Sequence, residues 1–187
     1  MERAIFTKEM AEPYGDDLDL TWVKNVVRKN IDTNVIDGQP RGHKNLIIVM
    51  EENSEMIQVL SSALLNNLDR IAILEEMADI YLGLYYLEDI IMQPSKEMPK
   101  VEINCFETSS EELLFLIKLL SMLNQEISKY IREKGNNDSL FLRMKEIELS
   151  LNKMQDIFGI SDGLLWKAIQ VKTKRIDDVL KKDGIYK

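Results

Sequence analysis

Apolar residues recur every three or four positions along most of the chain, which is the spacing of one face of an α-helix. Leu46, Ile47 and Met50 open the clearest such stretch, and Leu60 and Leu64 end it. The same spacing predicts helices over residues 20–30, 43–66, 68–92, 109–134, 139–158 and 161–184. We therefore predict an all-α fold, a bundle of about six helices around a four-helix core.

Turn residues separate the predicted helices. The first 19 residues are predicted to be irregular, and residues 32–42 contain the Pro, Gly and Asp that favour a loop. Proline breaks any helix in the segment 96–105, which predicts a second loop. Ser109 and Glu112 have the spacing of a capping box, so they mark the expected start of the fourth helix.

A faint internal repeat relates the middle of the chain to the part that follows. A shift of 70 positions aligns the helices at 43–66 and 68–92 with those at 109–134 and 139–158. The alignment places asparagine pairs and Leu-Ile pairs on one another. If the repeat is real, the bundle is pseudo-twofold and one chain builds the four-helix core; otherwise the shared Leu/Ile-rich composition of two helical hairpins explains the match.

Composition narrows the class of protein. The chain has 187 residues, 45% hydrophobic and 30% charged, so it can bury a core as one domain over residues 1–187. Its formal net charge of −8 argues against binding nucleic acid by a broad basic face. One histidine and one cysteine exclude His-clustered metal sites and Cys-rich zinc sites. The most apolar stretch, residues 71–92, carries five acidic residues, so we expect no membrane span and a cytoplasmic protein.

Four acidic residues are spaced to share one site. Glu52 and Glu55 lie three positions apart and therefore share one helix face. Glu76 and Asp79 have the same spacing in the next predicted helix. The link between these helices is short, so they should pack as antiparallel neighbours with the two acidic pairs facing one another. Four carboxylates in one place repel, and a hard cation such as Mg²⁺ offsets that repulsion and bridges to phosphate oxygens.

The alternative explanation for these acids is a solvated helix face, because Glu-rich helices are common. The helix at 68–92 argues against it. After Met77 this helix is apolar nearly all round, which predicts a central place in the bundle. Glu76, Asp79 and Tyr86 lie on one stripe of it. A carboxylate on a buried helix is costly unless it is paired or bound to metal, so the pattern favours a magnesium site.

The two acidic motifs also carry a family resemblance. Glu51-Glu52-x-x-Glu55, followed by Glu75-Glu76-x-x-Asp79, resembles the signature of the MazG-like, all-α nucleotide pyrophosphohydrolase superfamily. That superfamily also includes the dimeric dUTPases and the phosphoribosyl-ATP pyrophosphohydrolases. The strongest part of the resemblance covers residues 43–92, and residues 109–181 are additional helices that would complete the bundle of a single MazG-like domain.

The resemblance implies an enzyme of nucleotide-pool housekeeping. It implies that a nucleoside triphosphate is hydrolysed between its α and β phosphorus atoms, giving a monophosphate and pyrophosphate. It implies Mg²⁺ as the cofactor, with Mn²⁺ as a substitute, held by Glu52, Glu55, Glu76 and Asp79. One carboxylate would orient or deprotonate the attacking water, with Glu52 as the first choice and Glu51 as the second.

Other side chains are candidates for binding the nucleotide. Lys172 and Arg175 lie three apart on the last predicted helix, as in the Lys/Arg-bearing segment of the family, and arginine suits bidentate contact with phosphate. A solvated basic face explains them equally well, and Arg41 with Lys44 is a second option for binding phosphate. The candidates for contact with the base are Gln58, Tyr86 and Trp22.

Two further classes of function stay open on the sequence. The protein could be a non-catalytic sensor that binds a nucleotide or a metal without turnover. It could also be a helical interaction protein in which the acids are coincidental. A homodimer is the expected assembly, and a monomer is expected if the internal repeat supplies the whole four-helix core.

Overall fold

A computed structural model describes residues 6–91, 101 and 106–184, and this part of the chain contains seven helices and no strand. The helices are α1 (Lys8–Ala11), α2 (Leu20–Thr33), α3 (His43–Leu64), α4 (Arg70–Ile90), α5 (Ser109–Ile131), α6 (Asn137–Phe158) and α7 (Asp162–Lys182). The predicted all-α bundle of about six helices is confirmed, since α2 to α7 are the six long helices that the apolar spacing indicates. The short α1 lies in the segment predicted to be irregular. The loop predicted at 96–105 lies outside the described residues, except for Val101.

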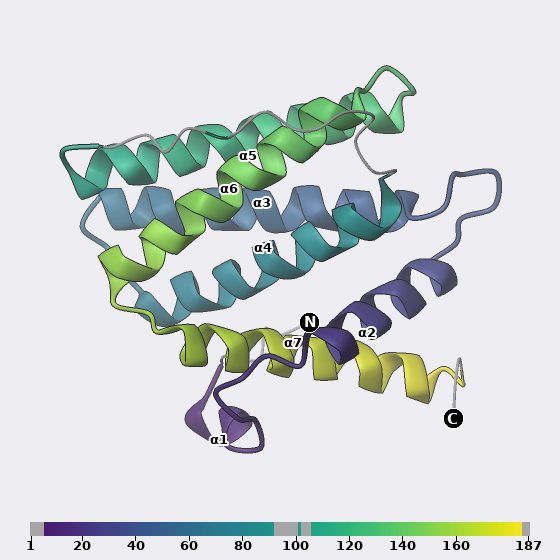
Figure 1. Ribbon diagram of the computed structural model, residues 1–187, viewed down its shortest axis with the longest axis horizontal. Helices are drawn as coiled ribbons and strands as arrows, with labels where there is room; N and C mark the ends of the chain where they lie inside the picture. Colours follow the sequence, from purple (N-terminus) through teal and green to yellow (C-terminus); the bar gives the residue numbers. More distant parts are fainter. Residues whose placement is uncertain (1–5, 92–100, 102–105, 185–187) are drawn as a thin grey trace.

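The long helices form three layers (Figure 1). Helices α5 and α6 make the first layer, α3 and α4 the second, and α2 and α7 the third. The first layer meets the second mainly through α5 and α3, whereas the third packs on α4. The hairpins α3–α4 and α5–α6 are the two segments that the proposed repeat aligns.

Helix α4 lies at the centre of this arrangement, as its sequence predicts. It contacts α2, α3, α6 and α7, and side chains all along it are buried. Ile73, Met77 and Leu87 are fully buried among these helices. Polar groups on α4 are therefore shielded from water by its neighbours. None of the described helices, α4 included, is long and apolar enough to cross a membrane.

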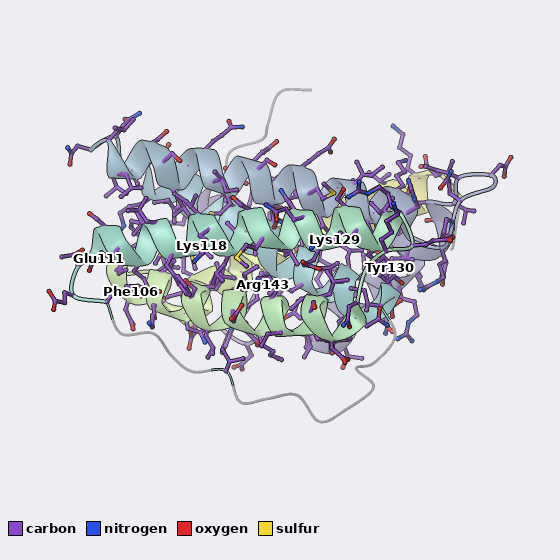
Figure 2. The ribbon with its side chains drawn as sticks, turned by 90° about the horizontal axis from the view of Figure 1, so that it is seen from above. Phe106, Glu111, Lys118, Lys129, Tyr130 and Arg143 are labelled. Carbon is purple, nitrogen blue, oxygen red and sulfur yellow. The ribbon has the colours of Figure 1, made fainter. Side chains whose placement is uncertain are left out.

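The residues that begin the helices are mostly those with capping side chains. Asp69 accepts hydrogen bonds from the backbone N–H groups of Ile71 and Ala72 in the first turn of α4, and Ser161 caps α7. The prediction for α5 is wrong by one residue. Its capping box is formed by Thr108 and Glu111, so Glu111 stands in the first turn of α5, at the end opposite Lys129 and Tyr130 (Figure 2). Glu112 instead turns inward, where Lys153 pairs with its carboxylate at 3.1 Å.

The link between α3 and α4, residues 65–69, is short, and the two helices pack as antiparallel neighbours (Figure 1). This arrangement confirms the predicted packing and sets Glu52 of α3 against the acidic face of α4. Helix α7 then packs along the other side of α4, which brings Lys172 to the same place. Helix α2 contacts both α4 and α7 and closes the third layer.

Candidate functional site

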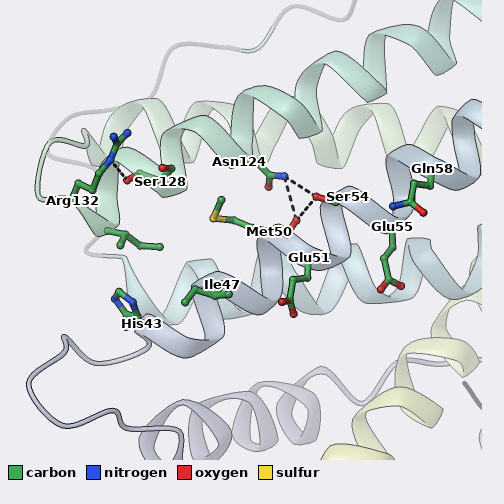
Figure 3. A pocket seen from close by; sticks show the side chains of 11 residues that line it. His43, Ile47, Met50, Glu51, Ser54, Glu55, Gln58, Asn124, Ser128 and Arg132 are labelled. Carbon is green, nitrogen blue, oxygen red and sulfur yellow. Dashed lines mark hydrogen bonds between the residues drawn. The ribbon is translucent and has the colours of Figure 1, made fainter. Parts of the chain in front are cut away.

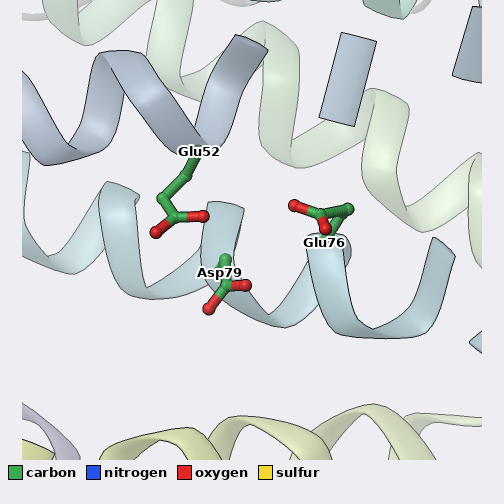
Figure 4. A group of neighbouring side chains, drawn as sticks. All are labelled: Glu52, Glu76 and Asp79. Carbon is green, nitrogen blue, oxygen red and sulfur yellow. The ribbon is translucent and has the colours of Figure 1, made fainter. Parts of the chain in front are cut away.

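Three carboxylates converge between α3 and α4. Glu52, Glu76 and Asp79 each offer an oxygen, and these oxygens all lie within 4.8 Å of one another. Figure 4 shows Glu52 reaching from α3 toward the two acids of α4. The spacing of three residues on α4 places Glu76 and Asp79 on one face, and the antiparallel packing brings Glu52 opposite that face.

Burial makes this cluster electrostatically costly. Glu76 is completely buried, the side chain of Asp79 is 12% exposed, and Glu52 is half-buried. The pKa of Glu52 is raised from 4.5 to about 7, first by desolvation and then by the negative charge of Asp79 and its acidic neighbours. The Glu52 carboxyl therefore titrates near neutral pH when no metal is bound. A bound cation would offset the same repulsion and restore the charged form.

Lys172 supplies one positive charge to the cluster. Its ammonium forms an ion pair with Asp79, and both side chains are shielded from water. Helix α7 places it there because α7 packs along α4. Arg175, one turn further along α7, is half-buried and lies within 3.4 Å of the sulfur of Met10. The two cations predicted to bind phosphate thus stand beside the carboxylates.

A cavity of about 290 Å³ opens beside the carboxylates. It receives five of the residues singled out from the sequence: Glu52, Asp79, Tyr86, Lys172 and Arg175. It is completed by residues that the sequence reasoning missed or left unassigned: Asn30, Asn34, Ile48, Val49, Leu82, Gly83 and Ile176. The asparagines had a signal, because Asn30 interrupts the apolar stripe of α2 between Val27 and Ile31. A polar residue on a buried helix face marks a contact that hydrophobic spacing does not explain.

The other predicted site residues lie elsewhere. Glu51, Glu55 and Gln58 are exposed and line an open groove of about 810 Å³ between α3 and α5. Figure 3 shows Glu51 and Glu55 along α3, with their carboxylates pointing away from Asn124 of α5. Glu55 is near enough to raise the pKa of Glu52, but it does not belong to the group of three converging carboxylates.

The remaining candidates also have other contacts. Trp22 is half-buried and stacks on Tyr14, with ring centroids 6.5 Å apart, and it does not line the 290 Å³ cavity. Arg41 pairs with Asp32 and Asp89, which ties the loop before α3 to the end of α4. Arg41 does not line the cavity either.

The donor set fits a hard divalent cation. Three carboxylates offer only oxygen ligands, which suit Mg²⁺ and Mn²⁺ and not a soft metal. Three protein ligands leave coordination positions for water and for phosphate oxygens, and the adjoining cavity gives room for both. These residues would therefore suit a metal together with an anionic ligand.

Comparison of the chain with protein-family models, with curated proteins and with solved structures finds no match. The function of the protein therefore rests on the chemistry of its own residues.

Proposed function

We propose that the protein is a Mg²⁺-dependent nucleoside triphosphate pyrophosphohydrolase, which cleaves the α–β phosphoanhydride to a nucleoside monophosphate and pyrophosphate. One observation carries the proposal: carboxylates from α3 and α4 converge at a cavity that also receives Lys172 and Arg175 from α7. The resemblance of the two acidic motifs to the MazG-like superfamily supports the same reaction.

The carboxylates and the cations have separate roles in this reaction. Glu52, Glu76 and Asp79 would hold the metal, which neutralises phosphate charge when bound. Lys172 and Arg175 bind phosphate oxygens and orient the triphosphate, and the arginine can do so with two parallel hydrogen bonds. Phosphoryl transfer needs mainly such positioning and charge stabilisation.

Glu52 is the carboxylate best placed to accept a proton from the attacking water. It lines the cavity together with Asp79, and Asp79 is already paired with Lys172. Glu51, the other candidate base, is exposed on the groove between α3 and α5.

A non-catalytic sensor of nucleotides or metal is the second candidate. Lys172 already pairs with Asp79, and Glu55, the fourth acid of the motif, lies outside the converging group. A protein with this arrangement could bind a metal and a nucleotide and lack turnover. A helical interaction protein accounts less well for acids on the most buried helix. As an enzyme, the protein would serve nucleotide housekeeping in the cytoplasm, as a homodimer or as a monomer.

The test is pyrophosphate release from a panel of nucleotides with Mg²⁺ or Mn²⁺. The panel contains the common ribo- and deoxyribonucleoside triphosphates, dUTP, oxidised nucleotides and phosphoribosyl-ATP. We expect metal-dependent release that Glu52→Gln abolishes. The matched control is Glu126→Gln, a half-buried glutamate on α5 that pairs with Lys129 and does not line the cavity. Binding of metal and nucleotide without release would favour the sensor, and no effect of metal would reject both.

A further inference from the structure

The end of the cavity away from the carboxylates is built from a cluster of side-chain amides. Three donors converge on the Oδ1 atom of Asn30: Nδ2 of Asn45 at 2.7 Å, Nδ2 of Asn34 at 2.9 Å and the hydroxyl of Tyr86 at 2.9 Å. Asn45 lies in α3 and Tyr86 in α4, whereas Asn34 directly follows the last residue of α2. A carbonyl oxygen has two lone pairs, so three donors saturate it.

The direction of these hydrogen bonds is set by a neighbouring lysine. The ammonium of Lys44 lies 3.3 Å from Oδ1 of Asn34, and an ammonium can only donate. The amide nitrogen of Asn34 therefore faces Asn30, and the atom of Asn30 that receives it must be the oxygen. Burial raises the pKa of Tyr86, so its hydroxyl keeps its proton and donates as well. Asn30 lines the cavity, and because its oxygen is taken by the three donors, its NH₂ group is the part of the amide that remains for a ligand.

The amide cluster contains a buried polar atom that lowers the stability of the fold. Asn45 is completely buried, and its Oδ1 atom has no hydrogen-bond partner in the described part of the chain. A buried amide oxygen without a partner is unfavourable, and such groups in a native protein need an explanation. The other half of the same amide holds Asn30 in its orientation. Local costs of this kind are expected where a side chain is positioned for a ligand.

The helices set the distance between this cluster and the carboxylates. Asn45 precedes Glu52 by seven residues on α3, and Tyr86 follows Asp79 by seven residues on α4. Because the two helices are antiparallel, both steps run in the same direction, and each covers about 10 Å along the axis. The walls between the two ends are mainly apolar: Ile48, Val49, Leu82, Gly83 and Ile176. A nucleoside whose phosphates lie at the carboxylates has the reach to place its base against Asn30.

We propose that Asn30 reads the base of the nucleotide and selects bases with a carbonyl group over bases with an exocyclic amino group. This inference rests on the proposed function, which places the phosphates at the carboxylates. The edge of the base farthest from the sugar then meets Asn30, and that edge carries position 4 of a pyrimidine or position 6 of a purine. The NH₂ group donates to the carbonyl oxygen of uracil, thymine or guanine. In cytosine or adenine it meets another donor, which leaves both groups without a partner.

The experiment compares the binding of UTP and CTP analogues whose α–β bridge is an imido group, which the proposed reaction does not cleave. Isothermal titration with Mg²⁺ gives a dissociation constant for each, and their ratio is the readout. For the wild type we expect the uridine analogue to bind about tenfold more tightly, the effect of one mismatched hydrogen bond at a partly buried site. Equal binding of the two analogues would overturn the inference, and so would the failure of both to bind.

Two variants test whether Asn30 causes the preference. Asn30→Asp keeps an oxygen for the three donors and turns the NH₂ group into an acceptor, so the ratio should reverse in favour of the cytidine analogue. The added negative charge weakens the binding of both analogues, so the ratio of their dissociation constants is compared rather than either constant alone. Asn30→Ala removes the donor without adding charge, and the ratio should fall to about one. An unchanged ratio in either variant would contradict the assignment.

The matched control is Asn152→Asp. Asn152 is an exposed asparagine of α6 that accepts a hydrogen bond from the hydroxyl of Tyr81 at 3.0 Å, and it does not line the cavity. Its ratio should equal that of the wild type.

Failure of the proposed function looks different from failure of this inference. If the uridine analogue binds selectively but no pyrophosphate is released from UTP, only the proposed hydrolysis is rejected. If pyrophosphate is released but the ratio of dissociation constants is the same in the wild type and the Asn30 variants, only the recognition of the base by Asn30 is rejected.

Discussion

Replacing Glu52 with glutamine should have opposite effects on stability with and without magnesium. In the metal-free protein, the pKa of Glu52 is raised from 4.5 to about 7, so the folded state holds a proton that the unfolded state releases. Stability is therefore highest below about pH 4.5 with respect to this group, and it falls as the pH rises toward and through 7. Glutamine does not titrate, so the variant should not show this loss.

The size of the effect follows from the shift in pKa. A rise from 4.5 to about 7 corresponds to an upper limit of about 3.4 kcal/mol, at about 1.36 kcal/mol for each pKa unit. Glu52 is only partly buried, so solvent screening reduces this to about 1–2 kcal/mol. In EDTA at pH 8, Glu52→Gln should be more stable than the wild type by about that amount. Near pH 4.5 the two proteins should be nearly equal.

With magnesium, the wild type should be more stable than Glu52→Gln. A ligand that binds only the folded state stabilises it, and the wild type keeps all three converging carboxylates whereas Glu52→Gln does not. Urea unfolding followed by circular dichroism, at pH 5 and pH 8 and with EDTA or Mg²⁺, measures all four conditions. Glu126→Gln should follow the wild type in each. If the wild type and Glu52→Gln lost stability equally between pH 5 and pH 8 in EDTA, the assumed cost of the buried cluster would be refuted.

Three further substitutions have defined outcomes. Lys172→Met should lower kcat/KM for pyrophosphate release by at least tenfold, which steady-state kinetics measures. It should also lower the stability of the metal-free protein at pH 8 in urea unfolding, because Asp79 loses its cation. Gly83→Ala should fold normally, since a Cβ there meets Val49 at an ordinary 3.4 Å, yet it narrows the cavity and should raise KM with little change in melting temperature. Thr108→Ala should cost about 1 kcal/mol in urea unfolding by removing the cap of α5, without changing kcat.

Local spacing predicts the helices well because each long helix packs one face on its neighbours. The residues of that face are apolar, so Leu and Ile recur along the sequence at the helical spacing. It cannot choose between overlapping caps. Thr108-x-x-Glu111 and Ser109-x-x-Glu112 both match a capping box, and the choice depends on Glu112 finding Ser150 and Lys153 on another helix. That contact joins residues about 40 positions apart, which no local pattern contains.

The site also contains residues that local spacing predicts and residues that depend on long-range packing. The spacing of three residues brings Glu76 and Asp79 to one face, and the short link sets Glu52 against them, so these three could be predicted. Glu55 has the same spacing from Glu52, but the helix turns it toward solvent. The placement of Asn30 depends on α2 packing on α4, across 56 residues to Tyr86. Only the polar interruption of the apolar stripe on α2 pointed to it.

The most direct test of the central claim is ³¹P NMR of the products formed from UTP with Mg²⁺. We predict UMP and pyrophosphate, formed in equal amounts, with neither appearing in EDTA or with Asp79→Asn. The Asn152→Asp protein should give the same products as the wild type. Formation of UDP and inorganic phosphate, or no metal-dependent reaction with any nucleotide of the panel, would contradict the proposed function.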